Sequence, residues 1–170
     1  MTPTIRPERD RDHFSVRLLN QTAFETPAEA NLVDSLRARV DGALSLVAEV
    51  DGAVVGHIMF TPVDLDCGSQ RLVMGLGPMA VSPEQQRSGV GRALVEEGLA
   101  ECRRLGAVGV VVLGHPSYYP RFGFQPASGF GLASQYAVPD EVFMALELEA
   151  PGFSSCQGIV RYHPLFDEVT

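Results

Sequence analysis

The sequence predicts an α+β fold, in which helices and strands mix within a single domain over residues 1–170. Two observations lead to this prediction. The chain has 170 residues, of which 45% are hydrophobic, and this is enough to bury one sizeable core. Helical patterns come first and strands follow, and a strong amphipathic helix then separates two further strands, with no internal repeat or long linker between them.

The N-terminal part predicts a short strand at Thr4–Arg6, followed by a helix over Asp10–Phe24. In this helix Phe14, Leu18 and Ala23 lie near helical spacing, so we expect them to face the core.

A second helix is expected after Thr26–Pro27. Thr26 fits the cap position, Pro27 fits the first helical position, and Glu29 follows three residues after the cap. The helix runs to about Arg39 and turns three apolar side chains inward: Leu32, Val33 and Leu36.

Two strand patterns then predict an antiparallel hairpin. Leu44–Val50 and Ala53–Leu65 are rich in strand formers, and Asp51–Gly52 between them is typical of a tight turn. After a further turn at Asp66–Gln70, we expect a third strand over Arg71–Ser82, interrupted by two glycines and a proline: Gly75, Gly77 and Pro78.

Gly89–Leu105 is the clearest helix of the sequence. Its apolar stripe faces away from a charged stripe and consists of Val90, Leu94, Val95, Gly98, Leu99, Cys102 and Leu105. Gly106 suits the positive φ at which many helices end. Val108–Leu113 is an unbroken apolar run, so the strand–helix–strand order indicates a parallel crossover. Val142–Leu148 is expected to be a late strand.

Charge and cysteine content exclude several classes. The net charge of -8 and pI near 4.9 argue against nucleic acid as a partner, and no apolar run reaches the length of a membrane helix. We expect a cytoplasmic protein. All 13 basic residues are arginine, so the chain contains no lysine.

The cysteines are odd in number and widely spaced: Cys67, Cys102 and Cys156. This spacing argues against zinc and against a disulfide framework. Cys102 falls on the apolar face of its helix, which predicts a buried structural thiol.

The stretch Gln86-Arg87-Ser88-Gly89-Val90-Gly91 lies where a loop opens a helix. The first turn of a helix carries backbone N–H groups without intrahelical partners and the positive end of the helix dipole, and glycines let a ligand approach closely. The pattern therefore indicates a phosphate or pyrophosphate site, although a plain glycine-rich turn explains the glycines alone equally well. It is neither a Walker loop nor a dinucleotide-binding fingerprint.

These residues resemble a known family. Gln86–Gly91 resembles the Q/R-x-x-G-x-G/A signature of the GNAT N-acetyltransferase superfamily, and Met79-Ala80-Val81 resembles its fourth strand. Downstream, Leu113–Phe124 resembles the fifth strand and the short helix after it, with Tyr119 at the tyrosine position of the family. Gly56–Val63 and Tyr118–Phe124 are similar to the YhbS-like branch of predicted N-acetyltransferases.

The resemblance implies a GNAT fold, which has a mixed, mostly antiparallel central sheet with splayed fourth and fifth strands, flanked by helices. It also implies acetyl-coenzyme A as the cosubstrate and no metal. The residues that it assigns to coenzyme binding are Met79, Ala80, Val81, Gln86, Arg87, Ser88, Gly89, Val90, Gly91, Arg92, Tyr119 and Phe122.

Three catalytic roles need residues. The resemblance implies Tyr119 as the general acid that protonates the departing thiolate. Proline cannot donate to a sheet ladder, so Gly77–Pro78 predicts a break in pairing that turns the Met79 N–H toward the thioester oxygen, unless the strand simply ends there. The family often has a Glu on the fourth strand as general base, but Arg71–Ser82 contains no Asp or Glu. The open candidates for the base are Glu29, His57, His115, or water with backbone carbonyls.

The expected function is N-acetyl transfer from acetyl-coenzyme A to a primary amine, on a small molecule or a polypeptide, by direct attack in a ternary complex. The alternative is a non-catalytic GNAT-fold module that binds or senses acyl-coenzyme A. The missing acid favours this alternative slightly, whereas Tyr119 favours the enzyme. An unrelated phosphate-binding domain would require both motif matches to be chance. A homodimer also stays open.

Overall fold

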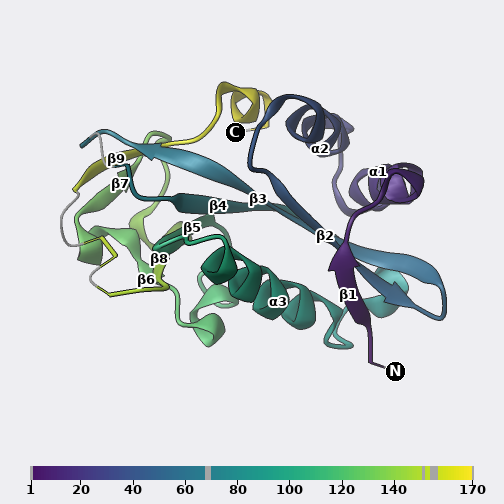
Figure 1. The fold of residues 1–170 in the computed structure, drawn as a ribbon. Coiled ribbons are helices and arrows are strands. Elements are labelled where there is room, and N and C mark those ends of the chain that lie inside the picture. Colours follow the sequence, from purple (N-terminus) through teal and green to yellow (C-terminus); the bar gives the residue numbers. More distant parts are fainter. Residues whose placement is uncertain (1, 68–69, 151, 154–156, 170) are drawn as a thin grey trace. The chain divides into compact units, whose positions relative to one another are not determined.

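The computed structural model describes residues 2–67, 70–150, 152–153 and 157–169. The chain divides into two compact units. Unit 1 comprises Met1–Thr61, Gly77–Gly98 and Leu165–Thr170, and unit 2 comprises Pro62–Leu76 and Leu99–Pro164. Strands β3 (Ala53–Leu65) and β4 (Val73–Val81) and helix α3 (Val90–Arg104) each contribute residues to both units (Figure 1).

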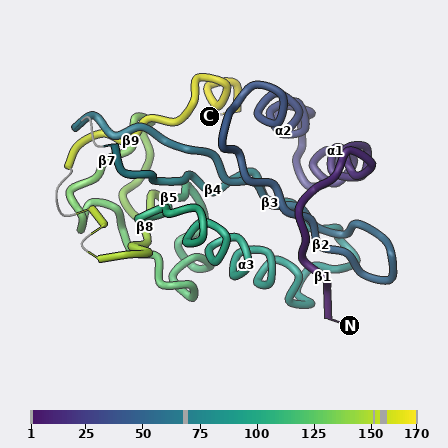
Figure 2. Tube along the Cα trace, viewed as in Figure 1, coloured from purple at the N-terminus to yellow at the C-terminus, as the bar shows by residue number. Residues whose placement is uncertain are grey.

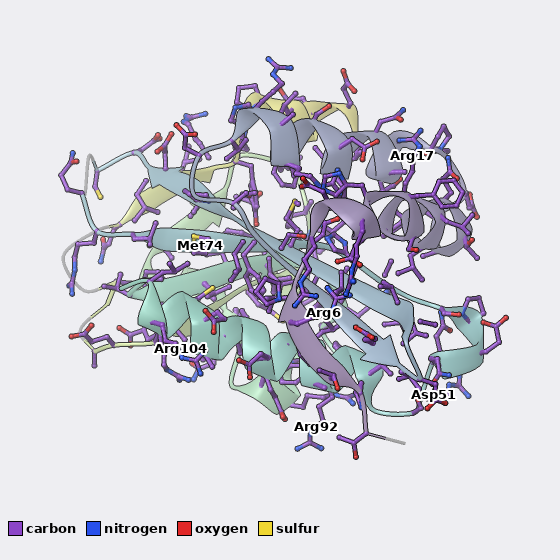
Figure 3. All side chains as sticks on the ribbon, turned by 45° about the vertical axis from the view of Figure 1, so that its right-hand side comes forward. Arg6, Arg17, Asp51, Met74, Arg92 and Arg104 are labelled. Atoms are coloured by element: carbon purple, nitrogen blue, oxygen red, sulfur yellow. The ribbon has the colours of Figure 1, made fainter. Side chains whose placement is uncertain are left out.

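Unit 1 contains a ladder in the order β1-β2-β3-β4. The elements preceding β3 are β1 (Thr4–Pro7), α1 (His13–Ala23), α2 (Ala28–Arg39) and β2 (Leu44–Val50). β1 pairs antiparallel with β2, and β2 pairs antiparallel with β3 through a turn in which Asp51 and Gly52 both have positive φ. Figure 2 follows this hairpin, and Figure 3 labels Asp51 at its tip. The predicted strand and hairpin are confirmed.

The alternation of side chains along β3 separates the helices of unit 1. A Cβ at Gly56 would lie 2.9 Å from Leu94 Cδ1 of α3, and one at Gly98 of α3 would lie 2.3 Å from Phe60 Cε1. His57, which points to the other face of the strand, contacts Asn20 of α1 at 3.5 Å. The part of α3 in unit 1 therefore covers one face of β3, while α1, which lies beside α2, covers the other (Figure 1).

The inward face predicted for the first helix is wrong. Asp10–Asp12 forms a 3-10 turn before α1. Phe14 is 78% exposed and Leu18 is 52% exposed, and Ala23 is exposed as well. The buried positions are Val16, Leu19 and Asn20. Because a polar residue, Asn20, occupies one of the inward positions, the apolar pattern alone indicated the wrong side of the helix.

The second helix begins one residue later than predicted. Pro27 takes the cap position, and the Thr26 hydroxyl accepts a hydrogen bond from the Ala28 N–H at 3.3 Å. Thr26 thus satisfies one of the backbone donors at the helix start, as a capping residue does. The predicted inward residues are confirmed, since Leu32, Val33 and Leu36 are all buried.

Two features at the end of α3 match the sequence and one does not. Gly106 has φ +85 and closes the helix, with the Ala107 N–H donating to the Cys102 carbonyl at 3.0 Å. Cys102 is a free, fully buried thiol, and burial raises its pKa to about 12. Leu105, which was expected on the buried stripe, is 52% exposed, because the helix has already ended at Arg104.

Unit 2 contains the order β4-β5-β8-β6, with β5 (Gly109–Leu113) parallel to β4 and β8 (Phe143–Glu147) antiparallel to β5. The parallel crossover and the late strand are confirmed. The end of β3 pairs with β9 (Gly158–Arg161), which pairs in turn with β7 (Leu132–Ser134). The strand β6 is Gln125–Pro126. The remaining 3-10 turns are Pro83–Gln85, Tyr119–Phe122, Ala127–Phe130, Asp140–Val142 and Pro164–Glu168.

Unit 2 departs from the sequence expectations at a cysteine. Cys67 is disulfide-bonded, which corrects the prediction drawn from the odd cysteine count and the wide spacing. Cys156, the third cysteine of that prediction, lies outside the described residues.

Candidate active site

The glycine-containing loop of unit 1 joins β4 to α3. After Val81, the 3-10 turn Pro83–Gln85 leads into Gln86–Gly89, and α3 starts at Val90. The chain reverses the sign of φ within this loop, from -66° at Gln86 to +63° at Arg87, and Gly89 has φ +93°. A positive φ at a non-glycine residue costs roughly 1–2 kcal/mol, and such strain concentrates at functional sites.

Side chains of the loop bind to the loop itself. The Ser88 hydroxyl donates to the Gln85 carbonyl, and the Gln86 side-chain amide donates to the Val81 carbonyl at 3.3 Å. The Ala93 N–H donates to the Gly89 carbonyl at 3.0 Å, so the N–H groups just before Ala93 precede the first i→i−4 bond of α3. Gln86 to Gly89 are exposed. The loop is therefore exposed up to Gly89, and the amides that follow it lack intrahelical acceptors, as an anion site requires.

Two arginines supply positive charge near this helix start. Arg87 is exposed within the loop. Arg92, in the first turn of α3, extends outward in Figure 3 and pairs with Glu96 at 2.8 Å. Three other arginines of unit 1, Arg6, Arg17 and Arg37, are held in ion pairs, for example Arg6 with Asp12 at 2.7 Å.

The strand that precedes the loop is irregular where predicted. The register of β4 with β5 runs from Val73 to Leu76, and the next residue, Gly77, has φ +136°. Pro78 has no N–H to offer to a ladder. Met79 and Val81 are half-buried, and Ala80 between them is buried. These residues thus follow the point at which the pairing of β4 with β5 ends, next to the predicted break at Gly77–Pro78.

Tyr119 lies in unit 2, where it opens the 3-10 turn Tyr119–Phe122. Only 7% of its surface is exposed, and its ring packs edge-on against Tyr118 at 5.1 Å and Phe124 at 5.7 Å. Phe122 is 6.4 Å away, and a Cβ at Gly114 would lie 2.3 Å from Tyr119 Cε2. Burial raises the pKa of Tyr119 to about 12. The phenol is therefore fixed by packing and keeps its proton at neutral pH.

His57 occupies the centre of a buried polar chain in unit 1. Ser45 Oγ donates to Glu8 Oε1 at 2.8 Å and also lies 2.8 Å from His57 Nε2. Because the Ser45 proton goes to the carboxylate, its oxygen accepts from His57 Nε2–H, and Nδ1 is left as the acceptor facing Asn20. Burial lowers the pKa of His57 to about 4, although Glu8 acts in the opposite direction.

This chain continues to an ion pair. Arg37 donates to both oxygens of Glu8, at 3.0 and 2.7 Å, and Arg37 also bonds Asp34 at 2.9 Å. The sequence indicated His57 but not its partners, because these come from distant parts of the chain and no local pattern marks them. The geometry supports a structural role for His57, since its side chain has no exposed surface.

The other two candidates for the base differ in exposure. His115 is exposed in unit 2, and its carbonyl accepts hydrogen bonds from the N–H groups of Tyr118 and Tyr119. Glu29 is half-buried in the first turn of α2 in unit 1, and its Oε2 is buried without a hydrogen-bond partner among the described residues. These candidates come from separate elements of the fold.

A cavity of about 280 Å³ lies between α1 and the residues that follow β4. Ser15, Leu18, Leu19 and Thr22 line it from α1, together with Val54 and Ser82–Glu84. The Ser82 hydroxyl donates to the Glu84 carboxylate and holds the pKa of that carboxyl below its usual value. Among the described residues, no group of three or more His, Cys, Asp or Glu side chains is placed to hold a metal ion. No described helix has the length and apolarity needed to cross a bilayer.

Comparison with known proteins decides the family. The model of the acetyltransferase (GNAT) family matches residues 11–124, which include the loop, the irregular strand and Tyr119. This chain belongs to the GNAT family. It is 35% identical to the N-acetyltransferase YhbS of Escherichia coli K12 over 164 residues, which cover 96% of this chain and 98% of YhbS. It is 40% identical to YjhQ of the same strain, covering 76% of this chain and 74% of YjhQ.

Solved structures support the same assignment. The crystal structure of Escherichia coli YhbS in complex with coenzyme A matches with a TM-score of 0.91, covering 98% of this chain and 93% of that one. A Brucella melitensis GNAT acetyltransferase in complex with acetyl-coenzyme A matches with a TM-score of 0.78 at 39% identity, covering 97% and 98%. The protein therefore has the GNAT fold and is an acetyl-coenzyme A-dependent acyltransferase, as the sequence predicted.

Proposed function

We propose that this protein transfers the acetyl group of acetyl-coenzyme A to a primary amine by direct attack in a ternary complex, within a single domain over residues 1–170. The observation that carries the proposal is the loop Gln86–Gly91, which is exposed up to Gly89 and leads into amides without intrahelical acceptors, in a chain that belongs to the GNAT family. The proposed acceptor is a small molecule or a polypeptide with a free amino group.

The residues of the loop fit a pyrophosphate. The amides of Gly89, Val90 and Gly91 precede the first closed turn of α3, and the positive end of the helix dipole adds to the charge of Arg87 and Arg92. Gln86 and Ser88 hold the loop shape through their bonds to backbone carbonyls. Met79, Ala80 and Val81 are assigned to the pantetheine arm, and Tyr119 and Phe122 complete the proposed coenzyme-binding set.

The proposed chemistry balances with one proton released. The amine nitrogen bonds to the acetyl carbon, the carbon–sulfur bond breaks, and the products are an N-acetyl amine, coenzyme A thiol and the proton from the acceptor ammonium. Tyr119 is proposed to donate to the departing sulfur, because its buried phenol keeps its proton at neutral pH. The Met79 N–H is proposed to stabilise the thioester oxygen, because it follows the break in the pairing of β4.

The test is acetyl transfer to a panel of primary amines, measured as thiol release and confirmed by the mass of the product. Because the chain has no lysine, acetylation of its own lysine side chains cannot contribute to the signal. We expect Tyr119→Phe to lower kcat about 100-fold with unchanged coenzyme A affinity, and the neighbouring Tyr118→Phe to retain most activity. Unchanged kcat in Tyr119→Phe would remove this residue from the mechanism. Coenzyme A binding without transfer to any amine would favour the sensing module instead.

The cytoplasm is the proposed location, on the sequence expectation alone. The disulfide at Cys67 runs against this expectation, because disulfides are rare in proteins of that compartment. Recovery of the protein from a fractionated cell, with the redox state of Cys67 measured by alkylation and mass spectrometry, tests the location and the bond together.

A further inference from the structure

Four buried or half-buried carboxylates of unit 1 are paired with arginine. Asp12 pairs with Arg6 at 2.7 Å, and Glu8 pairs with Arg37 at 2.7 Å. Two further acids follow the same rule, since Glu49 pairs with Arg6 at 2.7 Å and Asp34 pairs with Arg17 at 2.6 Å. The two most buried of these carboxylates, Asp12 and Glu8, thus receive charged donors, as the cost of burial requires.

Glu29 breaks this pattern. It is half-buried at the start of α2, yet no described residue forms an ion pair or hydrogen bond with it, and its Oε2 is buried without a donor. A buried polar atom that lacks a partner costs about 1–3 kcal/mol, and a charged one costs more. None of the 13 arginines, all of which lie in the described part of the chain, pairs with this oxygen. Its hydrogen-bonding capacity is therefore left for a donor from outside the chain.

The proposed reaction needs such a donor. A primary amine is protonated at neutral pH, so the acceptor arrives as an ammonium ion with three N–H groups. The other candidates for receiving it fit less well: His57 is fully buried with both ring nitrogens facing partners, and His115 is an exposed surface side chain. β4 carries no acid that could take this role.

We infer that Glu29 is the carboxylate that binds the acceptor, with its buried oxygen receiving an N–H of the acceptor ammonium ion. This inference rests on the proposed transfer to an amine. The acceptor is then a cationic alkylamine, and Glu29 contributes to the affinity of the enzyme for that acceptor. Glu29 acts before the chemical step, when the ammonium is held and its proton passes to water.

The experiment compares Glu29→Gln and Glu29→Asp with Glu25→Gln. Glu25 is an exposed acid in the connection between α1 and α2, shortly before Glu29, so it controls for the change of net charge. The probes are 1,4-diaminobutane, spermidine, L-lysine and a tetrapeptide with a free N-terminus. The measured quantities are kcat and KM for the best acceptor of the wild-type protein, the Kd of coenzyme A, and the Tm of each variant.

We expect Glu29→Gln to raise the amine KM about 10- to 100-fold, the range of one charged hydrogen bond, with the Kd of coenzyme A unchanged. Its Tm should stay level or rise, because an unpaired buried charge is removed. Glu29→Asp should recover part of the affinity, and Glu25→Gln should resemble the wild type.

Two outcomes overturn the inference. One is an amine KM in Glu29→Gln within twofold of the wild type. The other is a lower Tm with equal losses of amine and coenzyme A affinity, since that would make Glu29 structural. A wild-type protein that binds coenzyme A but acetylates none of the four probes contradicts the amine-transfer proposal itself, so that failure is distinguishable from a failure of Glu29 alone.

Discussion

At the scale of single residues, His57 links folding to pH. Its folded pKa of about 4 lies below the usual value of 6.5 because burial disfavours the imidazolium form. Between these two pH values the unfolded chain binds a proton that the folded chain refuses, so stability falls as pH is lowered. We expect a loss of about 3 kcal/mol in the free energy of unfolding between pH 6.5 and 4, measured by urea denaturation.

The matched variant for this prediction is His57→Gln, which does not titrate. Its unfolding free energy should be lower at pH 7 but nearly independent of pH across the same window. Asp12 does not confuse the result, because Arg6 lowers the pKa of that carboxyl to about 2 and its titration falls at more acidic pH. An equal pH dependence in both proteins would show that His57 is not the responsible group.

A second prediction at the residue scale concerns Gly89. Its φ is +93°, and an added Cβ would find nothing within 4 Å, so Gly89→Ala tests conformational strain without a clash. In the free Gly89→Ala protein the loop relaxes away from this conformation. Binding must then restore it at a cost of roughly 1–2 kcal/mol, which should weaken coenzyme A binding about 5- to 30-fold. The control is Gly52→Ala in the β2–β3 turn, which has a similar φ of +80° and equal space. That variant should lose stability while its coenzyme A affinity, measured by calorimetry, remains unchanged.

At the scale of elements, close packing between α3 and β3 constrains Gly98. Alanine is favoured over glycine in a helix by about 1 kcal/mol. However, a Cβ at Gly98 would lie 2.3 and 2.5 Å from the ring of Phe60, which is fully buried. Overpacking of this kind costs about 1–3 kcal/mol, so we expect a net loss of stability in Gly98→Ala.

The shorter side chain of Phe60→Leu should relieve part of this loss. In a double-mutant cycle measured by urea denaturation, the two substitutions together should cost less than the sum of the single changes. Additive losses would mean that the contact between Gly98 and Phe60 does not limit the packing of α3.

The elements differ in how well the sequence predicts them, for physical reasons. The β2–β3 hairpin was predicted to the residue, because strand formers flank Asp51–Gly52, a dipeptide that tolerates positive φ. The face of α1 was wrong because a buried Asn20 bonds to the Val16 carbonyl, so polarity did not mark exposure. β9 was missed because it is short and pairs with distant segments, β3 and β7.

The residues of the candidate site also differ in how well the sequence predicts them. The loop Gln86–Gly91 and the break at Gly77–Pro78 were predictable, because glycine and proline impose backbone conformations locally. The disulfide at Cys67 and the burial of Glu29 Oε2 depend on tertiary contacts. No local pattern reports such contacts, which is why the sequence left the general base open among several residues.

At the scale of the whole molecule, ligand binding should stabilise the fold. A ligand at 100 times its Kd adds about 2.7 kcal/mol to the free energy of unfolding when it binds the folded chain only. We expect coenzyme A and acetyl-coenzyme A to raise Tm by similar amounts, because both carry the pyrophosphate proposed for Gln86–Gly91. ATP should raise Tm far less, since it lacks the pantetheine arm assigned to Met79–Val81. An equal rise in Tm with ATP would show that the site binds phosphate groups in general and is not specific for coenzyme A.

The direction of the hydrogen bonds around His57 has a spectroscopic consequence. Glu8 takes the Ser45 proton, so the imidazole, which has no exposed surface, carries its own proton on Nε2 and directs it to the serine oxygen. A ring proton held in this way exchanges slowly with solvent. It should give a separate proton resonance at neutral pH, split by ¹⁵N in labelled protein, where exposed imidazoles give none. That single line would reveal when unit 1 opens, long before the rest of the spectrum is assigned.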